Sequence, residues 1–223
     1  MNRLALIALL CAALCALPAV ALAASGGTQY GDPAVAAPTA LPAGDAVLLG
    51  RVMHVRGTLP GAGGETVVLE RREADGPWVQ AATAVADASG NFDAAWKTDH
   101  SGHFDLRARP AAATDGAAAA AAAAQQTSTV TVFRRTVATW FGPGFYGHRT
   151  ACGQRLSHRL LGVANRTLPC GTKVALLYRG RTITVPVVDR GPFGTGASYD
   201  LTAATAQALG MTTTSRIGAV RVG

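Results

Sequence analysis

The sequence lacks several features that would indicate metal or nucleic-acid binding. It has four cysteines in 223 residues and no CxxC spacing, which argues against a structural zinc site. His100 and His103 lie three residues apart with no third ligand in sight, so we interpret them as surface turn residues. No basic segment is interleaved with aromatic residues, despite a formal net charge of +7. We therefore expect no metal, no cofactor and no nucleic-acid partner.

Long apolar runs are also scarce, and the one at the N-terminus is short. After Arg3, residues 4–22 are almost wholly apolar, which nearly reaches the ~20 residues of a membrane span. The sequence Ala-Leu-Ala ending at Ala23 fits a signal-peptide cleavage site. We predict a signal peptide over residues 1–23, a secreted or cell-wall-associated protein, and no membrane span after cleavage. The alternative is an uncleaved anchor.

The cysteines reduce to one pair. Cys11 and Cys15 leave with the signal peptide, and each follows a leucine rather than the small residue expected before a lipidated cysteine. Cys152 and Cys170 remain, and an even pair in a secreted chain is usually a disulfide. A bridge of that loop size stabilises by about 3 kcal/mol. The competing interpretation is a catalytic thiol.

The positive net charge suggests a second partner. A secreted basic protein meets anionic wall polymers or a negative cell surface. The alternative is that the charge only maintains solubility.

The composition predicts two domains behind a leader. Residues 24–44 are rich in Ala, Gly and Pro and read as a flexible leader. Over residues 45–134, short alternating apolar runs are separated by turn clusters, which predicts a β-sandwich. The elements GETVVLERR, PW, GNF and FDLRA resemble bacterial immunoglobulin-like modules. Within this region, residues 111–126 are alanine-rich and predict a low-complexity loop, with a short helix as the alternative.

The C-terminal 88 residues predict a small, mostly β domain. TVATWF, KVALLY, RTITVPVV and IGAVRV are typical of strands. Pro186 removes a backbone donor, so its strand is expected at an edge or a bulge. One helix is predicted over residues 201–209, with Asp200 as N-cap and Gly210 just past its end.

Five ordered motifs carry a resemblance. Two of them lie in ATWFGPGFYGHRTACGQRL, and the others lie in NRTLPCGTKV, VPVVDRGPFGTG and YDLTAATAQALGM, in that order within residues 136–223. This region resembles the rare lipoprotein A (RlpA) family, which implies a six-stranded double-psi β-barrel with one short helix. The whole chain is then all-β, with the sandwich followed by the barrel. Related barrels occur in expansins and family 45 endoglucanases, so the fold alone does not decide the activity.

The resemblance implies lytic cleavage of peptidoglycan glycan strands, with Asp189 on the family's motif acid. A carboxyl near an apolar strand can hold the proton that the leaving oxygen needs. In a lytic transglycosylase the sugar's own 6-hydroxyl attacks, so one carboxyl can act first as acid and then as base. Arg190 would hold Asp189 ionised if the two paired. The alternative is that Asp189 is a turn acid satisfying backbone N–H groups.

Two family positions differ here. The family places a glutamate where this chain has Gln154 and a histidine where it has Asn165, and neither amide can transfer a proton. These replacements favour the alternative of an expansin-like protein that binds wall glycan without cutting it. His148 and His158 lie nearby, but we interpret both as exposed loop residues.

Further residues are expected to bind substrate. Aromatic faces stack on sugar rings, which favours Trp140 and Tyr146 as sugar contacts, whereas Phe141 and Phe145 are at least as well explained by packing. The expected substrate-binding set is Trp140, Tyr146, Gln154, Asn165, Arg190 and Asp200. The Cys152–Cys170 bridge is expected to make the loop beside the groove rigid.

Overall fold

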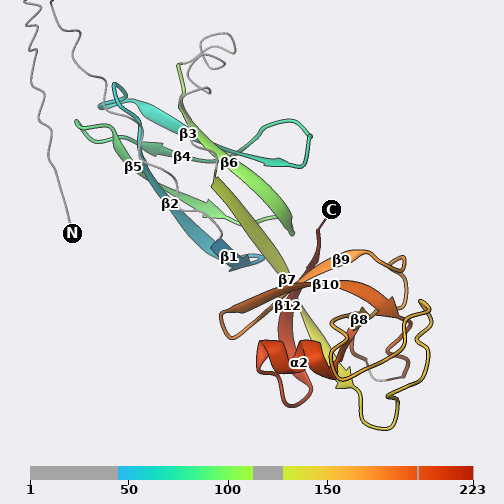
Figure 1. Ribbon diagram of the computed structural model, residues 1–223. Helices are drawn as coiled ribbons and strands as arrows, with labels where there is room; N and C mark the ends of the chain where they lie inside the picture. Colours follow the sequence, from blue (N-terminus) through green and yellow to red (C-terminus); the bar gives the residue numbers. More distant parts are fainter. Residues whose placement is uncertain (1–44, 113–127, 195, 223) are drawn as a thin grey trace, which may run out of the picture. The chain divides into compact units, whose positions relative to one another are not determined.

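One long strand, β7 (Ser128–Phe141), belongs to both parts of the fold (Figure 1). The computed structural model describes residues 45–112, 128–194 and 196–222. The first half of β7 pairs with β6 and β1, and its second half pairs with β12 and β11. The strand therefore runs without a break across the boundary expected near residue 135. The predicted signal peptide, leader and nearly all of the alanine-rich segment lie outside the described residues.

The N-terminal part is a two-sheet β-sandwich. One sheet has the order β1-β7-β6-β3-β4 and the other pairs β2 with β5. Its strands are β1 (Asp45–Leu48), β2 (Val52–Thr58), β3 (Thr66–Glu73), β4 (Val79–Val85), β5 (Asn91–Lys97) and β6 (Gly102–Pro110). The runs that the sequence indicated lie in these strands, and a turn divides the first of them, over residues 47–59, into β1 and β2. The immunoglobulin-like assignment stays a prediction.

Side-chain alternation explains the sandwich core. Along β5, buried residues alternate strictly with exposed ones, which is the pattern of a strand with one face on a core and one in water. Trp96 from β5 packs edge-to-face on Phe104 from β6, with ring centroids 6.0 Å apart. Both rings are almost fully buried, so the two sheets share one apolar core.

The C-terminal part is a closed six-stranded barrel, as predicted. Its order is β7-β12-β9-β10-β8-β11, and β11 returns to pair with β7. The strands after β7 are β8 (Val163–Ala164), β9 (Lys173–Tyr178), β10 (Arg181–Asp189), β11 (Tyr199–Thr202) and β12 (Ser215–Arg221). Closure leaves no unpaired edge in this sheet. The short strand β8 lies in a segment in which the sequence showed little regular pattern.

The helix is shorter than predicted. Helix α2 spans Ala203–Leu209, and its N-cap is Thr202 rather than Asp200. The Thr202 side chain accepts a hydrogen bond from the Thr205 backbone N–H, while Asp200 pairs within β11 opposite Thr139 of β7. Sheet pairing therefore extends two residues into the expected helix. Gly210 ends the helix in the left-handed conformation, as expected.

Pro186 lies in an interior strand rather than an edge strand, because β10 runs between β8 and β9. At Pro186 itself only β9 pairs, and the pairing with β8 begins at Val187 and shifts register before Asp189. Because proline has no N–H, it could not donate a backbone hydrogen bond to β8, and none is needed at this position. The bulge that the sequence predicted lies directly after Pro186, between Val187 and Asp189.

Across the described residues, no helix has the length and apolar character needed to cross a membrane.

Candidate functional site

Two carboxylates flank one small residue at the end of the barrel strands. Ala164 of β8 is the register partner of Asp189 on β10 and also of Asp200 on β11. Residues paired directly across strands project from the same side of a sheet. Asp189 and Asp200 therefore stand on either side of the Ala164 methyl group, two strand spacings or about 10 Å apart at the backbone. The small side chain leaves the space between them open.

Asp200 is the more buried acid of the pair. Burial raises the pKa of the Asp200 carboxyl, and the negative charge of Asp189 raises it further. The Thr139 hydroxyl donates to Asp200 Oδ1 at 2.7 Å, which lowers the pKa in part. The net direction is upward, so Asp200 keeps its proton to a higher pH than an ordinary aspartate.

Asp189 is fixed by backbone donors. The N–H groups of Ala151 and Arg190 both donate to Asp189 Oδ1, each at 2.8 Å. Its backbone carbonyl also accepts from the Asn165 N–H at 3.1 Å. Two separate chain segments, together with the N–H of the next residue, thus hold Asp189 in one orientation at the end of β10.

The guanidinium of Arg190 does not pair with Asp189. It donates to the carbonyl oxygens of Leu168 at 2.8 Å and Asn165 at 3.3 Å, and to Cys170 Sγ at 3.3 Å. Only the backbone N–H of Arg190 contacts the acid. The side chain therefore supports the loop beside the site and does not neutralise Asp189 with a salt bridge.

The predicted disulfide is present and contributes to the same support. Cys152 and Cys170 are bonded, with Cα atoms 5.6 Å apart. The Cys152 N–H donates to the Val188 carbonyl, one residue before Asp189. The bridge thus ties the segment that supplies the Ala151 N–H to the segment that receives Arg190.

A cleft of about 210 Å³ opens at the two acids. Its lining comes from four loop or strand segments and includes Phe141, Phe145, His148, Arg149, Thr150, Leu156, Ala164, Asp189, Arg190 and Asp200. His148 and Arg149 were not expected in the site. Their only sequence signal is their position next to the first motif, and the loop fold brings them to the acids.

Neither of the predicted amide ligands lines this cleft. The side-chain amide of Gln154 is assigned the orientation in which its nitrogen faces acceptors. In that orientation it donates to the carbonyl oxygens of Cys152 and Val188 at 3.1 and 3.2 Å. Asn165 is 8% exposed; it donates to the Ser198 carbonyl and accepts from the Leu168 N–H. Both amides hold backbone segments together around the site.

The predicted aromatic contacts also lie elsewhere. Trp140 Nε1 donates to the Thr212 carbonyl at 3.1 Å, and Tyr146 stacks on His158 with ring centroids 3.7 Å apart. The aromatic rings in the cleft are Phe141 and Phe145, and Phe145 is 58% exposed. Phe145 is therefore the better placed ring for a sugar.

The histidines that first suggested a metal do not form a site. His100 contacts Asp99 and Arg71, whereas His103 contacts the Thr131 hydroxyl. Within the described ranges no group of three or more His, Cys, Asp or Glu side chains is arranged to hold a metal ion.

Residues 134–223 match the family model described as lytic transglycolase. Over these residues the chain is similar to the RlpA family, as the motifs predicted, and it forms a closed six-stranded barrel. The match begins inside β7 and leaves most of the sandwich outside it.

Individual relatives agree. The chain is 43% identical over 86 residues to a probable endolytic peptidoglycan transglycosylase RlpA of Synechocystis, covering 38% of this chain and 27% of that protein. It is 44% identical over 79 residues to the Aquifex aeolicus protein of the same name, covering 34% and 35%. For the endolytic peptidoglycan transglycosylase RlpA of Campylobacter jejuni the values are 40% over 77 residues, covering 34% and 28%.

The chain therefore spans about a third or less of the length of these relatives. Among solved structures, a chain from a study of T-cell activation by toxic shock syndrome toxin-1 aligns to 43% of this chain, with 12% identity and a TM-score of 0.29. That score supports no conclusion.

Proposed function

We propose that the barrel cleaves peptidoglycan glycan strands as a lytic transglycosylase. The observation that carries the proposal is the placement of Asp189 and Asp200 on either side of Ala164 in one cleft. The names of the relatives, which are peptidoglycan transglycosylases, support the same activity.

In this mechanism each acid carries out one proton transfer: Asp200 is the general acid and Asp189 is the general base. Asp200, whose pKa is raised, donates its proton to the glycosidic oxygen as the bond from that oxygen to the anomeric carbon breaks. The 6-hydroxyl oxygen of the same sugar forms the new bond to the anomeric carbon. Its proton passes to Asp189, which is held in position by two N–H donors. The products are a 1,6-anhydro end and a free hydroxyl, and no water is consumed.

The rest of the cleft binds the sugar. The exposed ring of Phe145 offers an apolar face to a pyranose. His148 and Arg149 line the same cleft and bring hydrogen-bond donors to its wall.

The test is product analysis. The purified chain is incubated with stem-peptide-free glycan strands, and 1,6-anhydro-muramic acid ends are measured by mass spectrometry. We expect these ends to form, and to be lost in Asp189→Asn. The matched control is Asp75→Asn, which removes a carboxylate from an exposed turn of the sandwich; it should keep full activity. Full activity in Asp189→Asn would contradict the proposal.

One observation favours a second function, an expansin-like protein that binds glycan without cutting it. Gln154 and Asn165 stand where the family has ionisable residues, and both are committed to backbone contacts. Under this alternative the chain sediments with glycan strands but produces no anhydro ends.

We also propose that the protein is exported with cleavage after Ala23. N-terminal sequencing of the secreted chain should then begin at Ala24. A chain that retains Met1 in the membrane fraction would contradict this.

A further inference from the structure

A second hollow lies on the outer face of the barrel, away from the acid pair. Gly218 of β12 pairs with Arg135 of β7 on one side and with Leu177 of β9 on the other. A Cβ at Gly218 would meet Phe133 at 2.7 Å, so the close approach of Phe133 requires glycine there.

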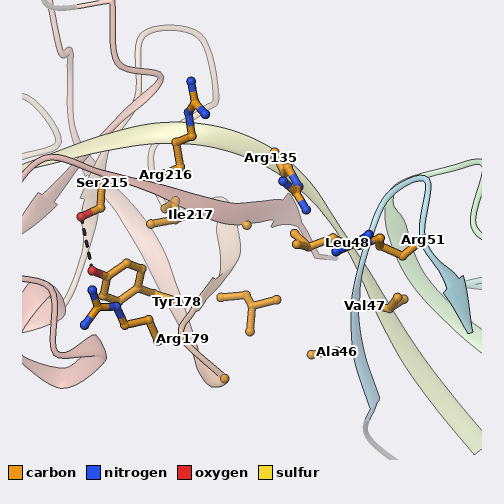
Figure 2. A pocket seen from close by; sticks show the side chains of 13 residues that line it. Ala46, Val47, Leu48, Arg51, Arg135, Tyr178, Arg179, Ser215, Arg216 and Ile217 are labelled. Atoms are coloured by element: carbon orange, nitrogen blue, oxygen red, sulfur yellow. Dashed lines mark hydrogen bonds between the residues drawn. The ribbon is translucent and has the colours of Figure 1, made fainter.

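Strand β1 and the turn after it form the far wall of this hollow. β1 pairs with β7 in parallel, with Leu48 opposite Phe133, and the Leu49 N–H donates to the Phe133 carbonyl at 2.8 Å. The volume of the hollow is about 740 Å³, more than three times the volume of the acid cleft. Its lining includes five aliphatic residues, Ala46, Val47, Leu48, Leu177 and Ile217 (Figure 2).

Four arginines line this hollow, and no acidic residue does. They are Arg51, Arg135, Arg179 and Arg216. In Figure 2, Arg51 and Arg135 are drawn at the end where Leu48 lies, and Arg179 is drawn at the other end beside Tyr178. Positive charge therefore marks both ends of an apolar floor.

These arginines have no internal counter-charge. The guanidinium groups of all four form no ion pair or hydrogen bond with another residue in the part of the chain that the structure describes; that of Arg179 lies over the Tyr178 ring at 5.3 Å. By contrast, Arg72 and Arg107 of the sandwich are paired with acids. A guanidinium that has no internal partner is available to an external anion, and its fork geometry matches phosphate.

We propose that this hollow, the arginine groove, binds a phosphodiester polymer of the polyglycerol phosphate type. Such a chain carries regularly repeated negative charges joined by short carbon units. The charges complement the arginines at the two ends, and the carbon units lie over the aliphatic floor. The open, elongated space accepts a passing polymer rather than a single enclosed ion. This inference is independent of the glycan cleavage proposed for the acid cleft.

The test measures binding of the full chain to polyglycerol phosphate by titration at several salt concentrations. In the triple variant Arg51→Gln, Arg135→Gln, Arg179→Gln, affinity should fall at least tenfold and its salt dependence should become shallower, because fewer counterions are released. The matched control removes the same charge elsewhere: Arg56→Gln, Lys97→Gln and Arg159→Gln, all exposed. It should change affinity less than threefold.

Three outcomes would overturn the proposal. They are no binding by the unaltered chain, equal losses in the two triple variants, and tighter binding of polyglutamate than of polyglycerol phosphate at equal charge concentration. Circular dichroism of each variant checks that it is folded. Anhydro-end formation is measured on the same samples, and it should be unchanged in both, so failure here is separable from failure of the proposed activity.

Discussion

The two halves of the molecule use charged side chains in opposite ways. In the sandwich, arginines pair with acids: Glu70 accepts from both Arg107 and Arg109. In the barrel, the guanidinium groups of Arg166 and Arg190 donate to backbone carbonyls. The ion pairs of the sandwich join residues between 54 and 109.

This difference in pairing indicates that the acids of the sandwich stabilise the fold, whereas those of the barrel cleft serve the proposed reaction. Paired acids in the sandwich are neutralised and hold strands together. The acids of the barrel cleft are left without an arginine partner, so Asp200 can acquire a raised pKa from burial and from Asp189. Substitutions in the two halves should therefore have different consequences.

The largest effect is expected for Asp200→Asn. Removal of the proton donor should lower the rate of anhydro-end formation about a thousandfold, within the range for general acid catalysis. Retention of more than a tenth of the rate would show that Asp189 acts alone. Mass spectrometry of the products measures the rate, with Asp75→Asn as the control.

Loss of the disulfide should affect both stability and activity. The double variant Cys152→Ala, Cys170→Ala should lose about 3 kcal/mol of unfolding free energy, measured by urea denaturation. Because the bridge also holds the segment that donates the Ala151 N–H to Asp189, the rate of cleavage should fall as well. A stability loss with an unchanged rate would show that the bridge does not position the acid.

Glu70→Gln should affect stability alone. Glu70 is 7% exposed, and its loss leaves two arginines without their carboxylate. The expected cost is about 2 kcal/mol, measured by urea denaturation. An altered cleavage rate at full folding would contradict the separation between the two halves. Asp75→Asn again provides the comparison.

The smallest expected effect is on the pH dependence of stability. The pKa of Asp200 is raised in the folded protein, so this carboxyl binds its proton more tightly folded than unfolded. Its contribution to stability is therefore lost as the pH rises from the ordinary aspartate value of 3.8 through the folded pKa. In Asp200→Asn this part of the decline should vanish. Urea denaturation at a series of pH values would detect it, and an unchanged pH profile would contradict the raised pKa.

Much of the architecture could be predicted from sequence because it depends on local patterns. Alternating residues of β5 marked a half-buried strand, and the ordered motifs marked the barrel. The disulfide followed from there being one possible pair. These features are encoded in short segments or in simple counting.

The details of the cleft depend on non-local pairing. Two residues, Val163 and Ala164, form a strand too short to leave a pattern, yet Ala164 sets the register of both acids. The same pairing drew Asp200 into β11 and moved the helix start. Residue type alone could not distinguish Phe145, which is exposed in the cleft, from Tyr146, which stacks on His158.

The continuity of β7 across the sandwich and the barrel affects how either part could be exchanged for another domain. The family match begins at residue 134, in the middle of a strand that lies between β6 and β1 in the sandwich sheet. A cut at that point would divide one continuous strand: its pairings with β1 and β6, at residues 128–133, would stay with the sandwich, and its pairings with β12 and β11, from residue 134 onward, would go with the barrel. The family match thus begins at the residue where β7 changes partners, and a graft that exchanges either half must rejoin the strand there without a shift in register.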